Sequence, residues 1–94
     1  MPIEIVWSPL ARARLREIRA YIALDKPDAA ERLATRIVAV AEALRSHPRL
    51  GRSRAEPGFR ELVIGGTPYI ILYQFQRGRI TITTIWHAAQ RERL

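Results

Sequence analysis

The sequence predicts an α+β domain in which a helical hairpin packs on one face of a mainly antiparallel sheet, with the element order βααβββ. Apolar residues recur at three- and four-residue spacings over residues 9–47, whereas β-branched and aromatic residues cluster in short runs over residues 59–87. Helices that are segregated from strands favour the α+β class. Because 94 residues suffice for one core and are too few for two, we expect a single domain over residues 1–94.

A short strand and then a helix are expected at the start of the chain. The strand is indicated by alternating apolar residues at Ile3, Ile5 and Trp7. Ser8 is a suitable N-cap and Pro9 a suitable first helical residue, so a helix should span residues 9–24. One face of this helix is apolar, with Ala11, Leu15, Ile18 and Ile22. The opposite face is cationic, with Arg12, Arg16 and Arg19.

A second helix is expected over residues 27–47. Pro27 suits its first turn, where Asp28 and Glu31 complement the positive end of the helix dipole. The apolar face consists of Ala30, Leu33, Ile37, Ala41 and Leu44, and the pattern ends at Pro48. His47 is best explained by its position at this helix end. The two helices therefore form a hairpin with long arms.

Residues 47–60 have no apolar period, so we interpret them as a basic loop that enters a strand. Its arginines Arg49, Arg52 and Arg54 lie close in sequence to Arg60 and form the strongest expected electrostatic footprint. Strands are then predicted over residues 59–64, 69–75 and 79–87. The breaks between them are short, which makes consecutive strands antiparallel neighbours.

The composition indicates an anionic partner and excludes several kinds of site. The net charge is +7, and 15 of the 16 basic residues are arginines, which pair with carboxylates and phosphates. A solubility role for this charge remains an alternative. There is no cysteine, zinc-ligand spacing or phosphate-binding glycine loop, so we expect no metal and no cofactor. No apolar run is long enough to span a membrane, and no signal peptide is recognisable, which favours a cytoplasmic protein.

Four stretches in order resemble the RelE/ParE toxins of bacterial toxin–antitoxin pairs, and together they cover nearly the whole chain. They are WSPLARARLREIRAYIALDKPDAAERL, HPRLGR, GFRELVIGGTPYIILYQF and ITITTIWHAAQ. The resemblance implies a small cytoplasmic toxin with the βααβββ fold. It also implies a hetero-oligomer with a cognate, ParD-like antitoxin that silences the toxin.

The resembled family divides by target. ParE-like members resemble inhibitors of DNA gyrase that cut no RNA, whereas RelE-like members resemble ribosome-dependent messenger RNA endonucleases. The helical hairpin and the PYIILY strand look closer to the ParE branch, so gyrase inhibition is our preferred hypothesis and mRNA cleavage the alternative. A small DNA-binding domain is a third and weaker hypothesis, because the long helical arms and the strands are not needed to read a groove.

The resemblance and the residue types together suggest three groups of site residues. For a nuclease, the candidates are Arg60, His87, Arg52 and Arg54. The expected target-contacting residues are Trp86, His87, Gln90, Arg91 and Arg93, which follow one another where the last strand ends. The expected antitoxin-binding residues are Arg12, Arg16, Arg19 and Arg60. Structural alternatives remain open for a strand-end histidine, a tryptophan at the core edge and a solvated arginine face.

Overall fold

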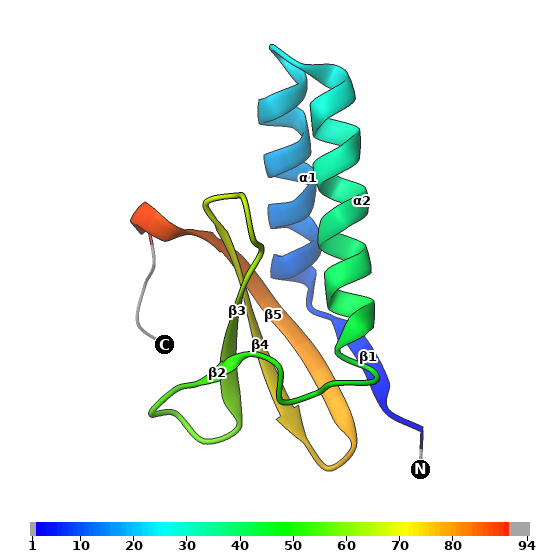
Figure 1. The fold of residues 1–94 in the computed structure, drawn as a ribbon, viewed down its shortest axis with the longest axis vertical. Coiled ribbons are helices and arrows are strands. Elements are labelled where there is room, and N and C mark those ends of the chain that lie inside the picture. Colours follow the sequence, from blue (N-terminus) through cyan, green and yellow to red (C-terminus); the bar gives the residue numbers. More distant parts are fainter. Residues whose placement is uncertain (1, 91–94) are drawn as a thin grey trace.

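The computed structural model describes residues 2–90, which form two helices and a five-stranded sheet (Figure 1). The elements are β1 (Glu4–Trp7), α1 (Pro9–Ala23), α2 (Pro27–Ala43), β2 (Arg52–Ser53), β3 (Phe59–Val63), β4 (Tyr69–Gln76), β5 (Arg79–His87) and the short 3-10 helix η1 (Ala88–Gln90). Neither α1 nor α2 is long and apolar enough to cross a membrane, and residues 2–90 contain no other α-helix.

The strand order in the sheet is β1-β5-β4-β3-β2. β1 runs parallel to β5, and the other neighbouring pairs are antiparallel. The helical hairpin covers one face of this sheet, and its tip projects beyond the sheet (Figure 1). The predicted α+β class and the βααβββ order are confirmed. The two-residue strand β2 was not predicted, because it lies in a segment without alternation and exists through its pairing with β3.

Ser8 fixes the junction between β1 and α1 to the interior strand β5. Its hydroxyl accepts a bond from the Ala11 N–H at 2.9 Å, as an N-cap should, and donates to the Thr83 carbonyl at 2.7 Å. Thr83 is the extra residue in β5 where the register with β4 shifts. The capping serine that the sequence indicated therefore also ties α1 to a bulge in the sheet.

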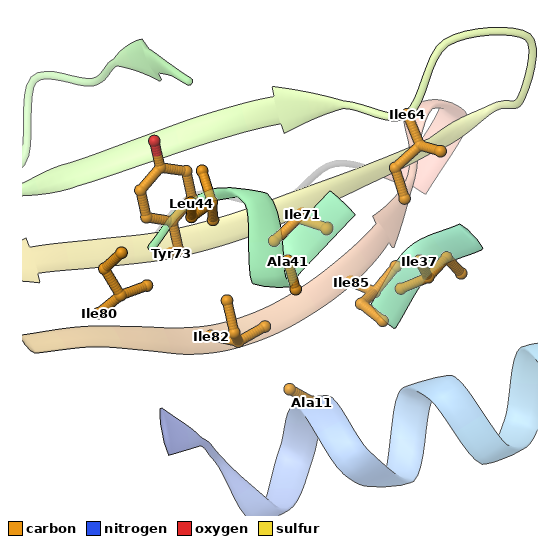
Figure 2. Close-up of a cluster of buried hydrophobic side chains, with 10 residues drawn as sticks. All are labelled: Ala11, Ile37, Ala41, Leu44, Ile64, Ile71, Tyr73, Ile80, Ile82 and Ile85. Atoms are coloured by element: carbon orange, nitrogen blue, oxygen red, sulfur yellow. The ribbon is translucent and has the colours of Figure 1, made fainter. Parts of the chain in front are cut away.

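The main core lies between the hairpin and the sheet (Figure 2). The helices contribute Ala11, Ile37 and Ala41, and Leu44 adds to them directly after α2. The sheet side contributes Ile64, Ile71, Tyr73, Ile80, Ile82 and Ile85. The expected apolar faces of both helices are thus confirmed. α2 ends at Ala43, earlier than predicted, because Leu44 and the next two residues turn back with bonds to carbonyls three residues earlier.

A second apolar cluster lies on the face of the sheet that the helices do not cover, which we call the helix-free face. It consists of Phe59, Ile70, Leu72 and Trp86. Thr84 is paired with Leu72 and is also buried there, and its hydroxyl has no hydrogen-bond partner among residues 2–90. Both faces of β4 and β5 are therefore apolar over part of their length, which explains their near-continuous runs of apolar residues.

The Tyr73 hydroxyl anchors the loop that follows α2. It donates to the Pro48 carbonyl at 2.8 Å and accepts from the Gly51 N–H at 2.8 Å. A Cβ on Gly51 would lie 2.8 Å from both the Tyr73 ring and the Glu61 carbonyl oxygen, so only glycine permits this approach. Burial raises the pKa of Tyr73, which keeps the hydroxyl protonated and able to donate.

Tyr73→Phe should lower the free energy of unfolding by about 1–3 kcal/mol, because the buried Gly51 N–H loses its acceptor. Urea unfolding measures this change, with no change in m-value expected. Tyr21→Phe is the control, since Tyr21 is 74% exposed and should lose no more than about 0.5 kcal/mol. Equal losses for the two variants would contradict a structural role of the Tyr73 hydroxyl.

Candidate functional site

A groove of about 720 Å³ runs between α1 and the end of the sheet where β5 stops. α1 contributes Arg14, Glu17, Ile18 and Tyr21 to its lining, and the sheet side contributes Tyr69, Ile85, Trp86, His87 and Ala89. Arg14 and Glu17 form an ion pair at 3.1 Å. The groove thus has aromatic and aliphatic walls with one ion pair at its rim.

His87 lies in this groove at the end of β5. Its ring makes an edge-on contact with the ring of its cross-strand partner Tyr69, with 5.6 Å between ring centroids. Its Nδ1 accepts a bond from the Ala89 N–H at 3.1 Å. Burial raises the pKa of Tyr69, and the neighbouring Tyr21 raises it further. His87 is therefore oriented by the backbone and by one aromatic ring. Such contacts are expected if this histidine has a structural role at the end of the strand.

Arg60 lies at the start of β3 and is bonded to the loop after α2. Its Nη1 donates to the Gly51 carbonyl at 2.8 Å and to the Arg49 carbonyl at 3.3 Å. Arg60 forms no ion pair within residues 2–90. Part of the donor capacity of this guanidinium is used to hold the loop.

Arg60 and His87 lie far apart on the sheet. Arg60 pairs with Tyr73, and His87 pairs with Tyr69, which lies four residues earlier in the same strand β4. Their backbones are therefore roughly 13 Å apart along the strands and two spacings of about 4.8 Å across them. The last strand is not adjacent to the strand that bears Arg60, because β4 lies between them. The structure therefore does not bring these two side chains into contact, and Arg60 is instead bonded to the Gly51 and Arg49 carbonyls.

Arg54 is not the free basic residue that the sequence suggested. It forms ion pairs with Glu56 and Glu61, and its side chain is only 14% exposed. The hydrogen bond to Glu56 is the main cause that raises the pKa of Arg54, and the bond to Glu61 adds to it. Its guanidinium carbon also lies 5.4 Å from the centroid of the Trp86 ring. The loop 54–58 is thereby fastened over the helix-free face.

The other loop arginines differ from one another. The guanidinium carbon of Arg49 lies 5.2 Å from the centroid of the Phe75 ring, a cation–π contact. Arg52 is exposed in β2 and has no side-chain partner within residues 2–90. The expected cluster of four free arginines is therefore reduced, because Arg54 is neutralised and Arg60 is bonded to carbonyls.

The arginine face of α1 is exposed, as expected, but two of its three members have structural partners. Arg12 donates to the Trp7 carbonyl at 3.2 Å, and Arg19 pairs with Glu31 on α2. Arg45 donates in the same way to the Ile3 carbonyl at 2.6 Å. Arg12 and Arg45 thus cover both ends of the outer edge of β1. Arg16 alone in this stripe has no side-chain partner among the described residues.

The residues proposed to contact the target lie partly outside the described chain. Trp86 is only 8% exposed, so most of its ring is buried. This burial is expected if the tryptophan packs at the edge of the core. Gln90 ends η1, and Arg91 and Arg93 lie outside the described residues. Tyr21 and Tyr69 line the groove but were not predicted as site residues. The available signal was a large aromatic residue, Tyr21, next to but off the apolar face of α1.

Comparisons with known proteins agree with this fold. A sequence model described as the ParE toxin of the type II toxin–antitoxin system parDE matches residues 5–92. Toxin Y4kP of Sinorhizobium fredii is 44% identical over 87 residues, covering 93% of this chain and 90% of that protein. Toxin RelE2 of Caulobacter vibrioides is 40% identical over 87 residues, covering 93% of this chain and 97% of that protein.

Solved structures show the same fold. The chromosomal ParDE toxin–antitoxin system from P. aeruginosa contains a chain that superposes with a TM-score of 0.80 at 23% identity, over 90% of this chain and 95% of that one. A YoeB dimer from Staphylococcus aureus superposes with a TM-score of 0.58 at 14% identity, over 89% of this chain and 94% of that one. The protein is thus a toxin of the type II toxin–antitoxin class. Within that class, the chain belongs to the ParE toxin family.

Arg54→Met should lower the free energy of unfolding by about 1–3 kcal/mol, because it removes charge-assisted bonds to two carboxylates in a mostly buried site. Arg52→Met, at an exposed position, is the control and should change stability by no more than about 0.5 kcal/mol. Urea unfolding measures both.

The Arg54 contribution should not vary across neutral pH through titration of the guanidinium. Its pKa is raised, so the stabilisation is fully present below the ordinary arginine pKa and is lost only as pH rises through the folded value. Equal stability of the Arg54 and Arg52 variants would contradict the role of Arg54 in fastening the loop.

Proposed function

We propose that this protein arrests bacterial growth by binding and inhibiting DNA gyrase in the cytoplasm, and that a cognate ParD-like antitoxin neutralises it. The observation that carries the proposal is the separation of Arg60 from His87 on the sheet. Inhibition through protein contacts needs an accessible surface and no assembled catalytic group.

Metal-free cleavage of RNA has stricter requirements. A base, an acid and a cation must meet at one phosphate, and each general acid or base contributes about 10² to 10⁴-fold. Among the described residues, His87 lies at one end of the sheet, Arg60 is bonded to loop carbonyls, and Arg54 is neutralised by two carboxylates. This distribution supports an inhibitor over a nuclease.

The antitoxin is proposed to bind the groove and the tip of the hairpin. Tyr21 is 74% and Leu24 is 86% exposed at the tip, next to the apolar groove wall. An amphipathic helix would bury these residues, and acidic side chains on it would pair with Arg16 and its neighbours on α1. This proposal retains the predicted stripe of Arg12, Arg16 and Arg19, but assigns most of the binding energy to the groove. Arg60 lies outside this surface.

The basic end of the chain is proposed to contact the target. His87 and Gln90 lead into Arg91 and Arg93, which follow the last described element. Cationic residues at a chain end favour association with an acidic surface and contribute mainly to the rate of association.

His87→Ala should reduce growth arrest no more than the loss of one target contact does, and ribosome-bound messenger RNA should stay uncut with and without it, because a gyrase inhibitor does not need this imidazole for proton transfer. Induction of the wild-type and variant proteins would be followed by growth, by gyrase supercoiling with purified components, and by mapping of ribosome-bound messenger RNA. Tyr69→Ala is the matched control for loss of the ring contact. Codon-specific cleavage that disappears only in His87→Ala would contradict gyrase inhibition and establish the ribonuclease alternative.

Tyr21→Ala should weaken antitoxin binding by roughly tenfold or more, as expected for a large aromatic contact at the centre of an interface. Toxicity in the absence of antitoxin should not change. Isothermal titration with the purified antitoxin measures the affinity, and Arg32→Ala, an exposed residue of α2 that does not line the groove, serves as the control. Unchanged affinity for Tyr21→Ala would contradict the groove as the antitoxin site.

A further inference from the structure

The helix-free face of the sheet carries a second hollow, of about 970 Å³, which none of the groups described so far occupies. It lies at the turn between β4 and β5 and extends across to β1. Residues from two sets of cross-strand neighbours line it. In one set Gln74 lies opposite Thr81. In the other Gln76 lies opposite Arg79, which in turn lies opposite Glu4. The helices cover the opposite face, so this hollow is separate from the groove beside α1.

The polar groups in this hollow are largely uncommitted. Gln74, Gln76 and the Thr81 hydroxyl make no side-chain hydrogen bond within residues 2–90, and Arg77 has no ion pair there. Arg79 is the exception, because it pairs with Glu4 at 2.8 Å. The hollow therefore presents two amides, one hydroxyl and one free guanidinium. A bound molecule can satisfy all four without breaking an internal contact.

Arg77 occupies a backbone position that arginine does not favour. It is the first of the two turn residues between β4 and β5, and its φ is 53°, followed by Gly78 with a φ of 73°. Asparagine and glycine are the preferred residues where both central residues of such a turn have positive φ. The sequence thus places a guanidinium at the rim of the hollow at a cost in backbone energy.

The spacing of the amides fits an extended polypeptide. Gln74 and Gln76 point to the same side of β4, so they lie about 6.8 Å apart, which is also the repeat of two residues in an extended chain. Each amide can donate to and accept from successive main-chain groups of such a segment. An acidic residue in the segment would pair with Arg77, and the +7 net charge favours its approach.

The same hollow fits nucleic acid poorly. No aromatic side chain lines it, whereas single strands are held chiefly by stacking of bases on aromatic rings.

We propose that this hollow binds an extended acidic segment of the protein that the toxin inhibits, with Gln74 and Gln76 on its main chain and Arg77 on a carboxylate. This inference deepens the proposed function and rests on its claim that the target is a protein.

The decisive variant is Arg77→Asn, because asparagine suits the turn and removes the guanidinium. We expect an unchanged or higher Tm, unchanged antitoxin affinity, and a concentration for half-inhibition of gyrase supercoiling that rises about tenfold or more, as for loss of a charged hydrogen bond. Growth arrest after induction should weaken in parallel. Arg32→Gln removes the same charge from an exposed position on α2 and should keep full potency.

Gln74→Glu and Gln74→Lys give a second test on the strand itself. The glutamate should repel an acidic segment and lower potency, and the lysine should not. Full toxicity of both Arg77→Asn and Gln74→Glu would overturn the proposal. Arg77-dependent binding of a labelled single-stranded oligonucleotide would also overturn it, in favour of a nucleic-acid ligand. If the wild-type protein does not inhibit gyrase, the proposed function fails, while the effect of Arg77→Asn on growth arrest still decides whether this hollow meets the target.

Discussion

The hydroxyl of Tyr73 is the contact on which most of the site geometry depends. Its ring lies in the core beneath the helical hairpin, and its oxygen holds the chain at Pro48 and Gly51, just after α2. The Gly51 carbonyl, placed in this way, accepts the bond from Arg60. A residue that composition marks as a candidate for phosphate binding is therefore engaged in loop closure. The same closure brings the chain to β2 and to Arg54, which fastens the loop over the helix-free face.

The fold separates the surface of this small protein into two regions with different chemistry. On the helix side, α1 and the end of β5 enclose a groove with aromatic and aliphatic walls and with exposed Tyr21 at its margin. On the helix-free side, an apolar cluster beneath the 54–58 loop gives way to a polar hollow near the turn between β4 and β5. Apolar grooves accept amphipathic helices, whereas rows of amides and an arginine suit an extended acidic chain. Two separate surfaces would let one small toxin carry both an antitoxin site and a target site.

The sequence predicted the elements and the helix faces well, because apolar periodicity, Ser8, Pro9 and Pro27 act locally. It did not predict β2, since a two-residue strand depends on the partner β3 and has no pattern of its own. The ion pairs could not be predicted either: Arg54 looks free in sequence, but Glu61 becomes its partner only when β3 and the loop fold together.

The distance between Arg60 and His87 follows from the strand order, which places β4 between their strands. Arg77 and Gln74 gave no signal as site residues, because their convergence with Thr81 depends on the strand register.

The central claim is that the toxin acts by occupying its target and not by turnover. A stoichiometric titration tests this most directly: purified toxin is added in increasing ratio to a fixed amount of gyrase, and separately to ribosomes carrying messenger RNA. An occupying inhibitor predicts loss of supercoiling that requires at least comparable amounts of toxin and gyrase, with intact messenger RNA at every ratio. Complete cleavage of ribosome-bound messenger RNA by a small fraction of an equivalent of toxin, with supercoiling unaffected, would contradict the account.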